Sequence, residues 1–391
     1  MRDGWVETTL DGIADYINGY PFKPADLGEV GLPVIRIKQL LDSNEPVDRT
    51  ETDTPDRCLL RDGDIVFSWS GTLAVRIWNR GPAKLNQHLF RVVEKEGLYK
   101  GIIPLILDHA IEELEEKSHG TTMKHITKQT LLPHKVLLPP LPEQKRIVDL
   151  ISSADSYIEA LQQQLDSVKR SRNAVLHQLL TAGGDDWLRA GLSEICTMIK
   201  RGQAPSYTEQ RSVTVLNQKC VRNGRIQFEF ARQTDSNTKP INEWAYLRAE
   251  DTLVNSTGVG TLGRVAFVGP QDEPLTVDSH LTIVRPDENK IQPSFLGLSL
   301  HFREADIEGL AAGSSGQTEL SREALGNLII TIPPIPEQKR IVEIITSMDK
   351  VTNQTQQTIT ESQNLRSGLL SDLLSGEHEI PSSYDKVIGA A

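Results

Sequence analysis

The chain has 391 residues and a formal net charge of −11, and its length predicts two or three domains. Its three cysteines (Cys58, Cys196 and Cys220) are odd in number and form no C-x-x-C pair, so neither a disulfide framework nor a zinc site is predicted. The sequence contains no signal peptide and no apolar stretch of about 18 residues. We therefore expect a cytoplasmic protein without a membrane segment.

A thirteen-residue segment occurs twice and predicts the domain organisation. PPLPEQKRIVDLI at 139–151 returns as PPIPEQKRIVEII at 333–345, with ten of the thirteen residues identical. This period far exceeds the roughly 20–50 residues of solenoid repeats, so it indicates a duplicated unit of one domain plus the segment that follows. The expected divisions are two globular domains at 1–141 and 183–335, two helices at 142–182 and 336–377, and a tail at 378–391.

The first globular segment is predicted to be a β-rich α+β domain. Apolar runs such as DIVFSW at 64–69 are separated by Gly, Pro and Asn turns, and a helical pattern covers 102–117. Lys and Arg in loops can hold phosphates, and Ser and Thr can read base edges, although such residues more often lie in loops that bind nothing. The candidates for DNA contact here are Tyr20, Lys23, Arg36, Lys38, Ser70, Thr72, Arg76, Lys124 and His125.

A long helix is predicted to follow, because Pro142 suits the first helical position and Glu143 suits the first turn. Apolar or small residues then recur in alternating steps of four and three, which is the a/d pattern of a coiled coil. These seam residues are Ile147, Ile151, Ala154, Ile158, Leu161, Leu165, Val168, Val175 and Leu179, with Arg172 as the polar interruption.

The second globular segment keeps the motif order of the first, although its loops differ. VIRIKQL at 34–40 matches VLNQKCV at 215–221, and His88 matches His280. Further matches pair Leu60, Arg61 and Asp64 with Leu247, Arg248 and Asp251, and GTLA at 71–74 with GTLG at 260–263. The second domain is therefore predicted to be α+β as well, with helix near 293–307 and strands at DTLVNS, RVAFVG and LTIVR.

A basic island lies at 198–225, where Glu209 is the one acidic residue. Such an island is typical of a phosphate-binding face on an acidic protein, but an ordinary solvated surface has the same composition. The DNA-contact candidates of this domain are Lys200, Arg201, Tyr207, Asn217, Arg222, Thr257, Arg264 and Gln317.

The second long helix keeps the frame of the first but has a polar middle. Its seam residues are Ile341, Ile345, Met348, Thr352, Thr355, Ile359, Ser362, Arg366, Leu369 and Leu373. We expect it to pack at both ends on the first helix and to leave a weaker centre open to another chain. Arg172 and Arg366 occupy equivalent positions, which favours a retained structural role such as a pair with a carboxylate.

Chain order predicts how the two helices pair. The first helix leaves domain one and ends at domain two, and the second starts from domain two, so intramolecular pairing makes them antiparallel with the domains at opposite ends. A helix of about 38 residues is roughly 57 Å long, and one turn of B-DNA is about 34–36 Å. A helix pair of this length could set a fixed spacing on a duplex.

Motifs for catalysis are weak in this sequence. Gly258 to Gly263 satisfies G-x-G-x-x-G, but a dinucleotide site needs a helix directly afterwards, and RVAFVG predicts a strand and hence a glycine-rich hairpin. Glu115-Glu116-Lys117 offers a nuclease-like E-x-K within an acidic helical run that is typical of a solvated face. His119 and His125 lack metal-ligand spacing. We therefore expect a chain without catalytic residues or a metal site.

The duplicated PPLPEQKRIV and PPIPEQKRIV motifs, each following a β-rich domain and opening a long helix, resemble the specificity subunits of bacterial type I restriction-modification systems. The resemblance covers nearly the whole chain. It implies two target-recognition domains and an antiparallel coiled coil in a pseudo-two-fold repeat. It also implies that each domain reads one half of a split, asymmetric site in double-stranded DNA.

The resemblance further implies which partners carry the chemistry. Two methyltransferase subunits would dock on the helix pair and bind S-adenosylmethionine, and restriction subunits would use ATP, while this chain would bind no cofactor. The expected docking and helix-start residues are Pro142, Glu143, Gln144, Arg146, Pro336, Glu337, Gln338 and Arg340. An alternative of another class is a coiled-coil spacer or adaptor whose end domains bind protein.

Overall fold

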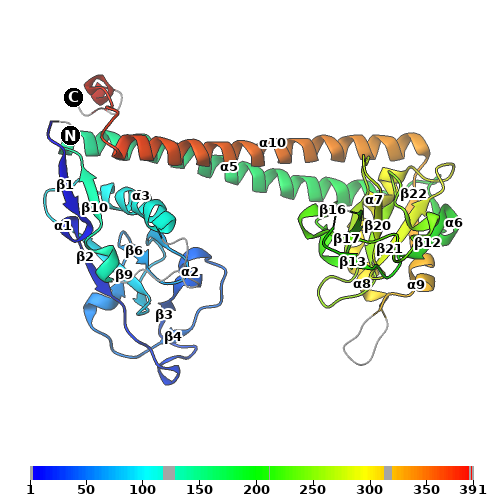
Figure 1. The fold of residues 1–391 in the computed structure, drawn as a ribbon, viewed down its shortest axis with the longest axis horizontal. Coiled ribbons are helices and arrows are strands. Elements are labelled where there is room, and N and C mark those ends of the chain that lie inside the picture. The colour runs from blue at the N-terminus through cyan, green and yellow to red at the C-terminus, as the bar shows by residue number, and fades with distance from the viewer. Residues whose placement is uncertain (1–2, 118–127, 211, 312–318, 387–388, 390–391) are drawn as a thin grey trace. The chain divides into compact units, whose positions relative to one another are not determined.

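The structure is a computed structural model that describes residues 3–117, 128–210, 212–311, 319–386 and 389 (Figure 1). The chain divides into two compact units. Unit 1 comprises Met1–Gln163 with Gln356–Ala391, and unit 2 comprises Gln164–Thr355. Each long helix, α5 (Leu141–Thr181) and α10 (Ile335–Leu374), therefore contributes one half to each unit.

The described part of unit 1 contains two four-stranded sheets and a two-stranded one. The first sheet has the antiparallel order β2-β9-β6-β7 (Ala14–Asn18, Leu89–Glu94, Ile65–Ser68 and Ala74–Ile77). The second has the order β4-β3-β8-β5 (Arg49–Thr50, Leu32–Ile35, Ala83–Leu85 and Leu59–Leu60), with β3 and β8 parallel. β1 (Val6–Thr9) pairs with β10 (Lys135–Leu138), which leads into α5.

Unit 2 repeats the first sheet and the β1–β10 pair of unit 1, and it shares three of the four strands of the second sheet. Its first sheet has the order β12-β21-β18-β19 (Cys196–Arg201, Leu281–Pro286, Thr252–Asn255 and Val265–Phe267). Its second has the order β13-β17-β14-β20 (Tyr207–Thr208, Arg232–Thr234, Val213–Leu216 and Leu275–Val277), again with one parallel pair, β14 with β20. β11 (Leu188–Gly191) pairs with β22 (Ile329–Ile332) before α10, and the hairpin β15–β16 (Val221–Arg222 and Arg225–Ile226) is an addition.

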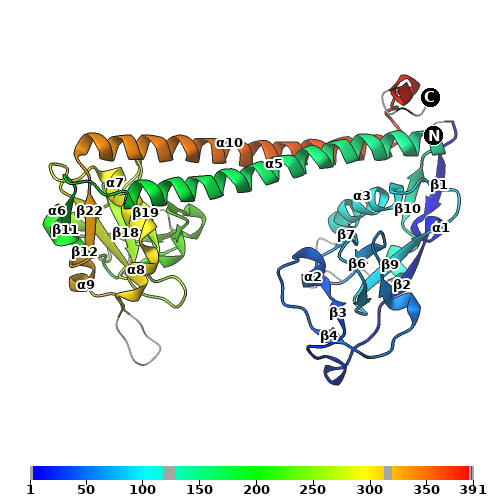
Figure 2. The same cartoon turned by 180° about the vertical axis from the view of Figure 1, so that it is seen from behind.

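Helices cover one face of the first sheet in each unit. In unit 1, α3 (Ile102–Lys117) packs on β7, and in unit 2, α7 (Pro293–Phe302) packs on β18 and β19 (Figure 2). The remaining short helices are α1 (Leu10–Ile13), α2 (Ile37–Leu41), α4 (Lys128–Leu131), α6 (Leu192–Ile195), α8 (Glu304–Gly309), α9 (Arg322–Gly326), η1 (Pro24–Asp26), η2 (Asp56–Cys58), η3 (Gln218–Cys220), η4 (Phe228–Phe230), η5 (Glu243–Ala245) and η6 (Ser382–Lys386). The strands and helices predicted from the sequence are thereby confirmed.

The central strand of each first sheet lies between two hydrophobic cores. Ile65 and Phe67 of β6 enter the core under α3, while Val66 points to a second core. In unit 2, Val254 of β18 enters the core under α7, while Leu253 points to a second core. Because successive side chains of a strand point to opposite faces, a strand buried on both faces carries apolar residues at consecutive positions, as at 65–67 of β6 and 253–254 of β18.

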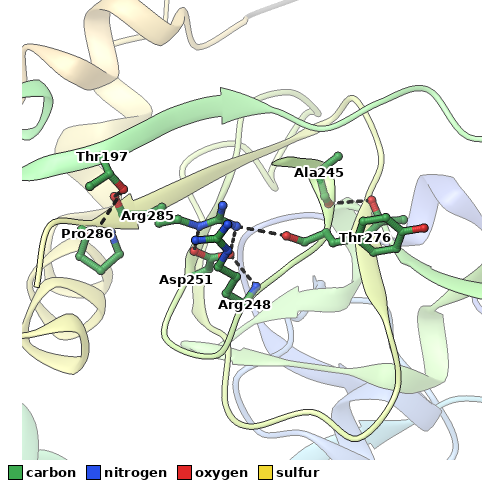
Figure 3. Close-up of polar contacts among 8 residues, drawn as sticks. Thr197, Ala245, Arg248, Asp251, Thr276, Arg285 and Pro286 are labelled. Carbon is green, nitrogen blue, oxygen red and sulfur yellow. Dashed lines mark hydrogen bonds and ion pairs between the residues drawn. The ribbon is translucent and has the colours of Figure 1, made fainter. Parts of the chain in front are cut away.

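A buried ion pair stabilises the second unit beside its first sheet (Figure 3). The carboxylate of Asp251, 1% exposed, accepts two hydrogen bonds from the guanidinium of Arg285 at 2.7 and 2.8 Å and one from the backbone N–H of Arg248 at 2.8 Å. In unit 1, Asp64 accepts the equivalent bond from the N–H of Arg61 at 2.8 Å. The match predicted between these aspartates is confirmed, and their role is to hold the turn before the central strand.

The predicted helix seams are confirmed, with each helix beginning one residue earlier than expected. Every predicted seam position of α5 and α10 is buried or half-buried. The open centre expected for α10 is wrong, because Thr355 is only 8% exposed and Thr352 is half-buried. Their hydroxyls donate to the carbonyl oxygens of Val351 and Met348, at 3.0 and 2.9 Å. A threonine whose hydroxyl is satisfied within its own helix can be buried in a seam.

Reciprocal ion pairs show that α5 and α10 are antiparallel in both units. In unit 1, Arg366 of α10 donates to Asp155 of α5 at 2.8 Å, and also to Asp108 of α3 at 2.7 Å. In unit 2, Arg172 of α5 donates to Asp349 of α10 at 2.8 Å. Arg172 and Arg366 occupy equivalent positions of the repeat, and so do Asp155 and Asp349. The predicted structural role of the two arginines is thereby confirmed. The placement of the globular parts at opposite ends stays a prediction.

Candidate nucleic-acid interface

Three chain segments meet at one junction in unit 1. The N–H of Gly19 donates to Leu89 O at 3.1 Å, and the N–H of Tyr20 donates to Leu85 O at 2.7 Å. The N–H of Asn86 donates in turn to Ile35 O at 3.1 Å. The ends of β2, β3 and β8 are thereby joined, and the segments that follow β2 and β3 carry four of the nine predicted DNA-contact residues of this unit: Tyr20, Lys23, Arg36 and Lys38.

Unit 2 builds the same junction from different residues. The N–H of Gly202 donates to Leu281 O, and the N–H of Asp278 donates to Leu216 O, both at 2.9 Å. A Cβ on Gly202 would lie 2.3 and 2.4 Å from the carbonyl oxygens of the strand end opposite, and a Cβ on Gly19 would meet the same two distances in unit 1. Only glycine lets the backbone approach so closely, so the loop after β2 requires Gly19 and the loop after β12 requires Gly202.

The side chains around the unit 1 junction mix aromatic and charged groups. The ring of Tyr20 contacts the ring of Phe22 edge to face, with centroids 5.0 Å apart. The guanidinium of Arg36 is paired with Asp48 at 2.6 Å, which reduces its availability to a phosphate. Trp69 lies between Phe90 and His88, with ring centroids at 5.6 and 6.0 Å.

The other candidates of unit 1 differ in exposure. Lys23, Lys38, Thr72 and Arg76 are exposed, whereas Ser70 is buried at 7%. The carbonyl oxygen of Thr72 accepts a hydrogen bond from the Ser68 hydroxyl at 2.6 Å, which closes the loop between β6 and β7. Lys124 and His125 lie outside the described residues. We conclude that the basic candidates are accessible, while Ser70 belongs to the fold.

The unit 2 junction carries a polar cluster. The hydroxyl of Tyr207 lies 3.5 Å from Asp278 Oδ2, and the guanidinium of Arg232 lies over the Tyr207 ring at 3.6 Å. Burial raises the pKa of the Asp278 carboxyl above its ordinary value, and burial together with Asp278 raises the pKa of Tyr207. Thr257 Oγ1 and His280 Nδ1 are 2.7 Å apart at the edge of this cluster. Its hydroxyl, imidazole and guanidinium groups are of the types that read base edges and phosphates, while the Asp278 carboxyl, 2% exposed, lies beneath them.

Several unit 2 candidates are engaged within the fold. Asn217 accepts from the N–H of Lys219 at 2.8 Å and donates to Phe230 O at 2.6 Å, so its amide caps η3. The Arg222 guanidinium lies 4.6 Å over the Phe230 ring. The Arg264 guanidinium donates to Gly260 O at 2.7 Å. Gln317 lies outside the described residues.

The basic island is spread over separate elements. Lys200 Nζ lies 3.7 Å over the Trp244 ring. Arg201 forms an ion pair with Glu319 and donates to Leu320 O at 2.8 Å. Arg225 instead donates to Asn353 Oδ1 of α10 at 3.1 Å, so it faces the long helix. The island in the sequence is therefore divided in the fold, and Lys200 is its member on β12 without an acidic partner in the described structure.

The two helix starts use their glutamines to hold the preceding chain. Gln144 Nε2 donates to Pro139 O, and its Oε1 accepts from the N–H of Tyr99, both at 2.8 Å. Gln338 repeats the arrangement with Pro333 O and the N–H of Gln292, again at 2.8 Å. Both side chains are at most 3% exposed, so their amides position the helix starts and do not face a partner.

The other helix-start residues differ between the two copies. Arg146 is 8% exposed, with its guanidinium bound to Asp385 at 2.7 Å, whereas its counterpart Arg340 is exposed. Glu143 is buried at 5%, whereas Glu337 is exposed and accepts from the indole N–H of Trp187 at 3.2 Å. Pro142 and Pro336 are exposed at both starts. The second start therefore offers more polar surface than the first.

The structure adds residues that the sequence patterns did not single out. Asn86 and Asp278 each lie two residues before the matched histidines His88 and His280, and the side chain of each accepts the histidine N–H, at 3.3 and 2.9 Å. That shared spacing is the sequence signal that could have identified Asn86 and Asp278. Trp69, Arg232 and Trp244 have no such signal, because the residues they contact are distant in sequence.

The remaining motifs have structural explanations. Gly258 to Gly263 connects β18 to β19 in an antiparallel hairpin, which confirms the predicted hairpin in place of a dinucleotide site. The side chains of Glu115, Glu116 and Lys117, at the end of α3, lie outside the described set, as does His119. Within the described residues, no cluster of acidic, histidine and cysteine side chains could hold a metal ion, and no described helix is long and apolar enough to span a membrane.

Comparison with known families and structures gives consistent matches. The family model for the type I restriction modification DNA specificity domain matches residues 2–170 and 184–362. The EcoBI type I specificity subunit of Escherichia coli is 23% identical over 96% of this chain and 87% of its own length. The MjaVIII specificity subunit of Methanocaldococcus jannaschii is 22% identical, over 82% and 80%.

Solved structures share the fold. The S subunit of a type I restriction-modification system from M. genitalium aligns with a TM-score of 0.55 and 16% identity, covering 95% of this chain and 96% of its own. A chain from a study of assembly and conformational transition in a type I system aligns with a TM-score of 0.63 and 17% identity, covering 97% and 99%.

Proposed function

The chain belongs to the type I restriction-modification DNA specificity family, and we propose from this premise that it is the DNA sequence-recognition subunit of a type I restriction-modification complex. The observation that carries the proposal is the duplicated junction. One backbone arrangement, with glycine at the same close approach, presents different side chains in its two copies. A repeated scaffold with unlike polar residues suits the reading of two unlike half-sites.

Each globular part would read one half of a split, asymmetric site. Lys23, Lys38 and Arg76 in the first part, and Lys200 in the second, would hold phosphates. Base edges would be read by exposed or half-buried side chains nearer the junctions: Tyr20, Thr72, Tyr207, Thr257 and Arg264. Asn86 and Asp278, which are 6% and 2% exposed, would instead hold the loops of His88 and His280 in place. Phosphate contacts set position and groove contacts set sequence.

The helix pair would set the spacer between the half-sites and dock two methyltransferase subunits. The exposed helix-start residues Pro142, Pro336, Glu337 and Arg340 are the docking candidates that remain accessible. In this proposal the chain itself is non-catalytic and cytoplasmic. S-adenosylmethionine and ATP would bind to the methyltransferase and restriction subunits.

Methylome sequencing of cells that carry this chain and its methyltransferase subunit would reveal the target. We expect modified adenines within a split, asymmetric motif. Purified complex should then bind a duplex with that motif in a salt-dependent manner, and should bind a duplex with one half scrambled at least 100-fold less tightly. Absence of DNA binding with the methyltransferase subunit present would refute the proposal and favour a protein-binding adaptor.

A further inference from the structure

Val259 is the most exposed large apolar side chain among the described residues, at 90%. It lies in the loop 256–264 between β18 and β19. An aliphatic side chain at this exposure contributes nothing to a core, so the packing of unit 2 does not account for it. Single exposed apolar residues are common on protein surfaces, and the surroundings of Val259 are therefore decisive.

The loop holds Val259 in a fixed place. The side-chain amide of Asn255, which is fully buried, donates to Gln218 O and Thr261 O, both at 3.0 Å. Gly258 and Gly260, on either side of the valine, have φ values of 104° and 71°, which other residues rarely adopt. A Cβ on Gly258 would also lie 2.3 Å from the Gln218 Oε1 atom. The loop is a braced turn that presents its apolar tip to solvent.

The residues next to the tip belong to the candidate interface. Thr257 precedes the turn and contacts His280 at 2.7 Å, and Arg264 follows it and bonds Gly260 O at 2.7 Å. The counterpart loop of unit 1 spans only 69–73, closes with the Ser68 hydroxyl on Thr72 O, and has no aliphatic residue at an equivalent tip. The exposed valine is therefore specific to unit 2 and is not part of the scaffold that the two units share.

We propose that Val259 is a specificity-determining residue that packs against the C5-methyl group of a thymine in the half-site read by the second globular part. This proposal rests on the function proposed above. The thymine methyl is the apolar group that base pairs display in the major groove. Valine is short and branched, unlike the Phe, Leu, Ile, Met and Pro side chains that wedge between base steps, so contact with a methyl edge suits it better than intercalation.

The test removes the methyl from the DNA and the valine from the protein. In duplexes that carry the target identified by methylome sequencing, each thymine of this half-site is replaced in turn by uracil, and binding to the complex of the full chain with its methyltransferase subunit is measured. At one position, the wild-type complex should lose about fourfold in affinity, the equivalent of about 0.8 kcal/mol for one buried methyl-sized group. With Val259→Ser, the same replacement should change affinity less than 1.5-fold. Leu188→Ser, at another apolar side chain that is 69% exposed in unit 2, should keep the fourfold loss.

Three results would overturn the proposal. The first is a half-site that contains no thymine. The second is that none of the uracil replacements weakens binding of the wild-type complex. The third is that the Val259→Ser complex keeps the thymine preference. In that last case, a loss of methyltransferase binding would identify the valine as a protein contact. Failure of the unsubstituted duplex to bind would instead refute the proposed function, so the two failures are distinguishable.

Discussion

The buried glutamine at each helix start should be essential because of its hydrogen bonds and not its size. Gln338, 1% exposed, satisfies the N–H of Gln292 and the carbonyl oxygen of Pro333 at once, both at 2.8 Å. Gln338→Ala leaves both groups buried without a partner. Each such orphaned group costs about 1–3 kcal/mol, so we expect a loss of about 3 kcal/mol in the free energy of unfolding of unit 2.

Gln338→Glu separates hydrogen bonding from packing, since it preserves the shape of the side chain. The introduced carboxyl can accept from the N–H of Gln292, but when ionised it cannot donate to the carbonyl oxygen of Pro333. Burial raises the pKa of such a carboxyl above its unfolded value of about 4.3, so the folded state binds more protons than the unfolded state. The free energy of unfolding should therefore fall as pH rises from about 4, and low pH should restore much of it.

Hydrogen exchange followed by mass spectrometry measures the effect in each unit separately, which avoids assuming that the whole chain unfolds in one step. Gln338→Ala should accelerate exchange at the Gln292 amide and leave that of Tyr99, which bonds Gln144, unchanged. Gln144→Ala should do the reverse, and Gln363→Ala, at an exposed position of α10, should do neither. Unchanged exchange at Gln292 in Gln338→Ala, or a Gln338→Glu variant as stable as wild type at pH 7, would refute the reasoning.

Three further predictions follow from the contacts around the junctions and helices. Gly19→Ala should lower the free energy of unfolding in urea by about 3 kcal/mol, because the added Cβ would lie 2.3 Å from a backbone oxygen. In the control Gly28→Ala the added Cβ meets open space, so the free energy of unfolding should change little. Equal effects in the two variants would contradict the close-approach argument. A double-mutant cycle of Arg172→Ala and Asp349→Ala should give a coupling of about 1 kcal/mol for this partly exposed pair, and strict additivity would show that the pair contributes nothing. The Arg146 guanidinium lowers the pKa of Asp385. Asp385→Asn should therefore be less stable than the wild-type protein at neutral pH, and the difference should vanish as pH falls below about 3.9 and through the lowered pKa. A difference in melting temperature that does not depend on pH would exclude the ion pair as its cause.

Much of the architecture could be predicted from local patterns. The duplicated PEQKRIV segment indicates the two-copy organisation, and the alternating steps of four and three predict the seams of α5 and α10, because helical periodicity is a property of consecutive residues. The apolar runs DIVFSW and DTLVNS predict the central strands for the same reason. The equivalence of Arg172 and Arg366 even predicts their structural role, since a repeat carries its ion pairs with it.

The candidate interface was harder to predict, because its members are brought together only by tertiary structure. Arg232 reaches Tyr207, and Lys200 reaches Trp244, across sheets and loops that separate them in the chain. The basic island at 198–225 looks continuous in the sequence, yet the fold pairs Arg201 with Glu319 and sends Arg225 to α10.

The repeat and the element types can be read from the sequence alone, because they depend on neighbouring residues. The need for glycine at Gly19 and Gly202 comes from backbone atoms of distant segments. Tertiary packing makes Gln144 and Gln338 internal hydrogen-bonding residues. It pairs Arg146 with the C-terminal segment and leaves Arg340 exposed, and it leaves Val259 exposed at the tip of its loop. Burial and pairing are set by which distant segments pack together, and a one-dimensional pattern does not contain that information.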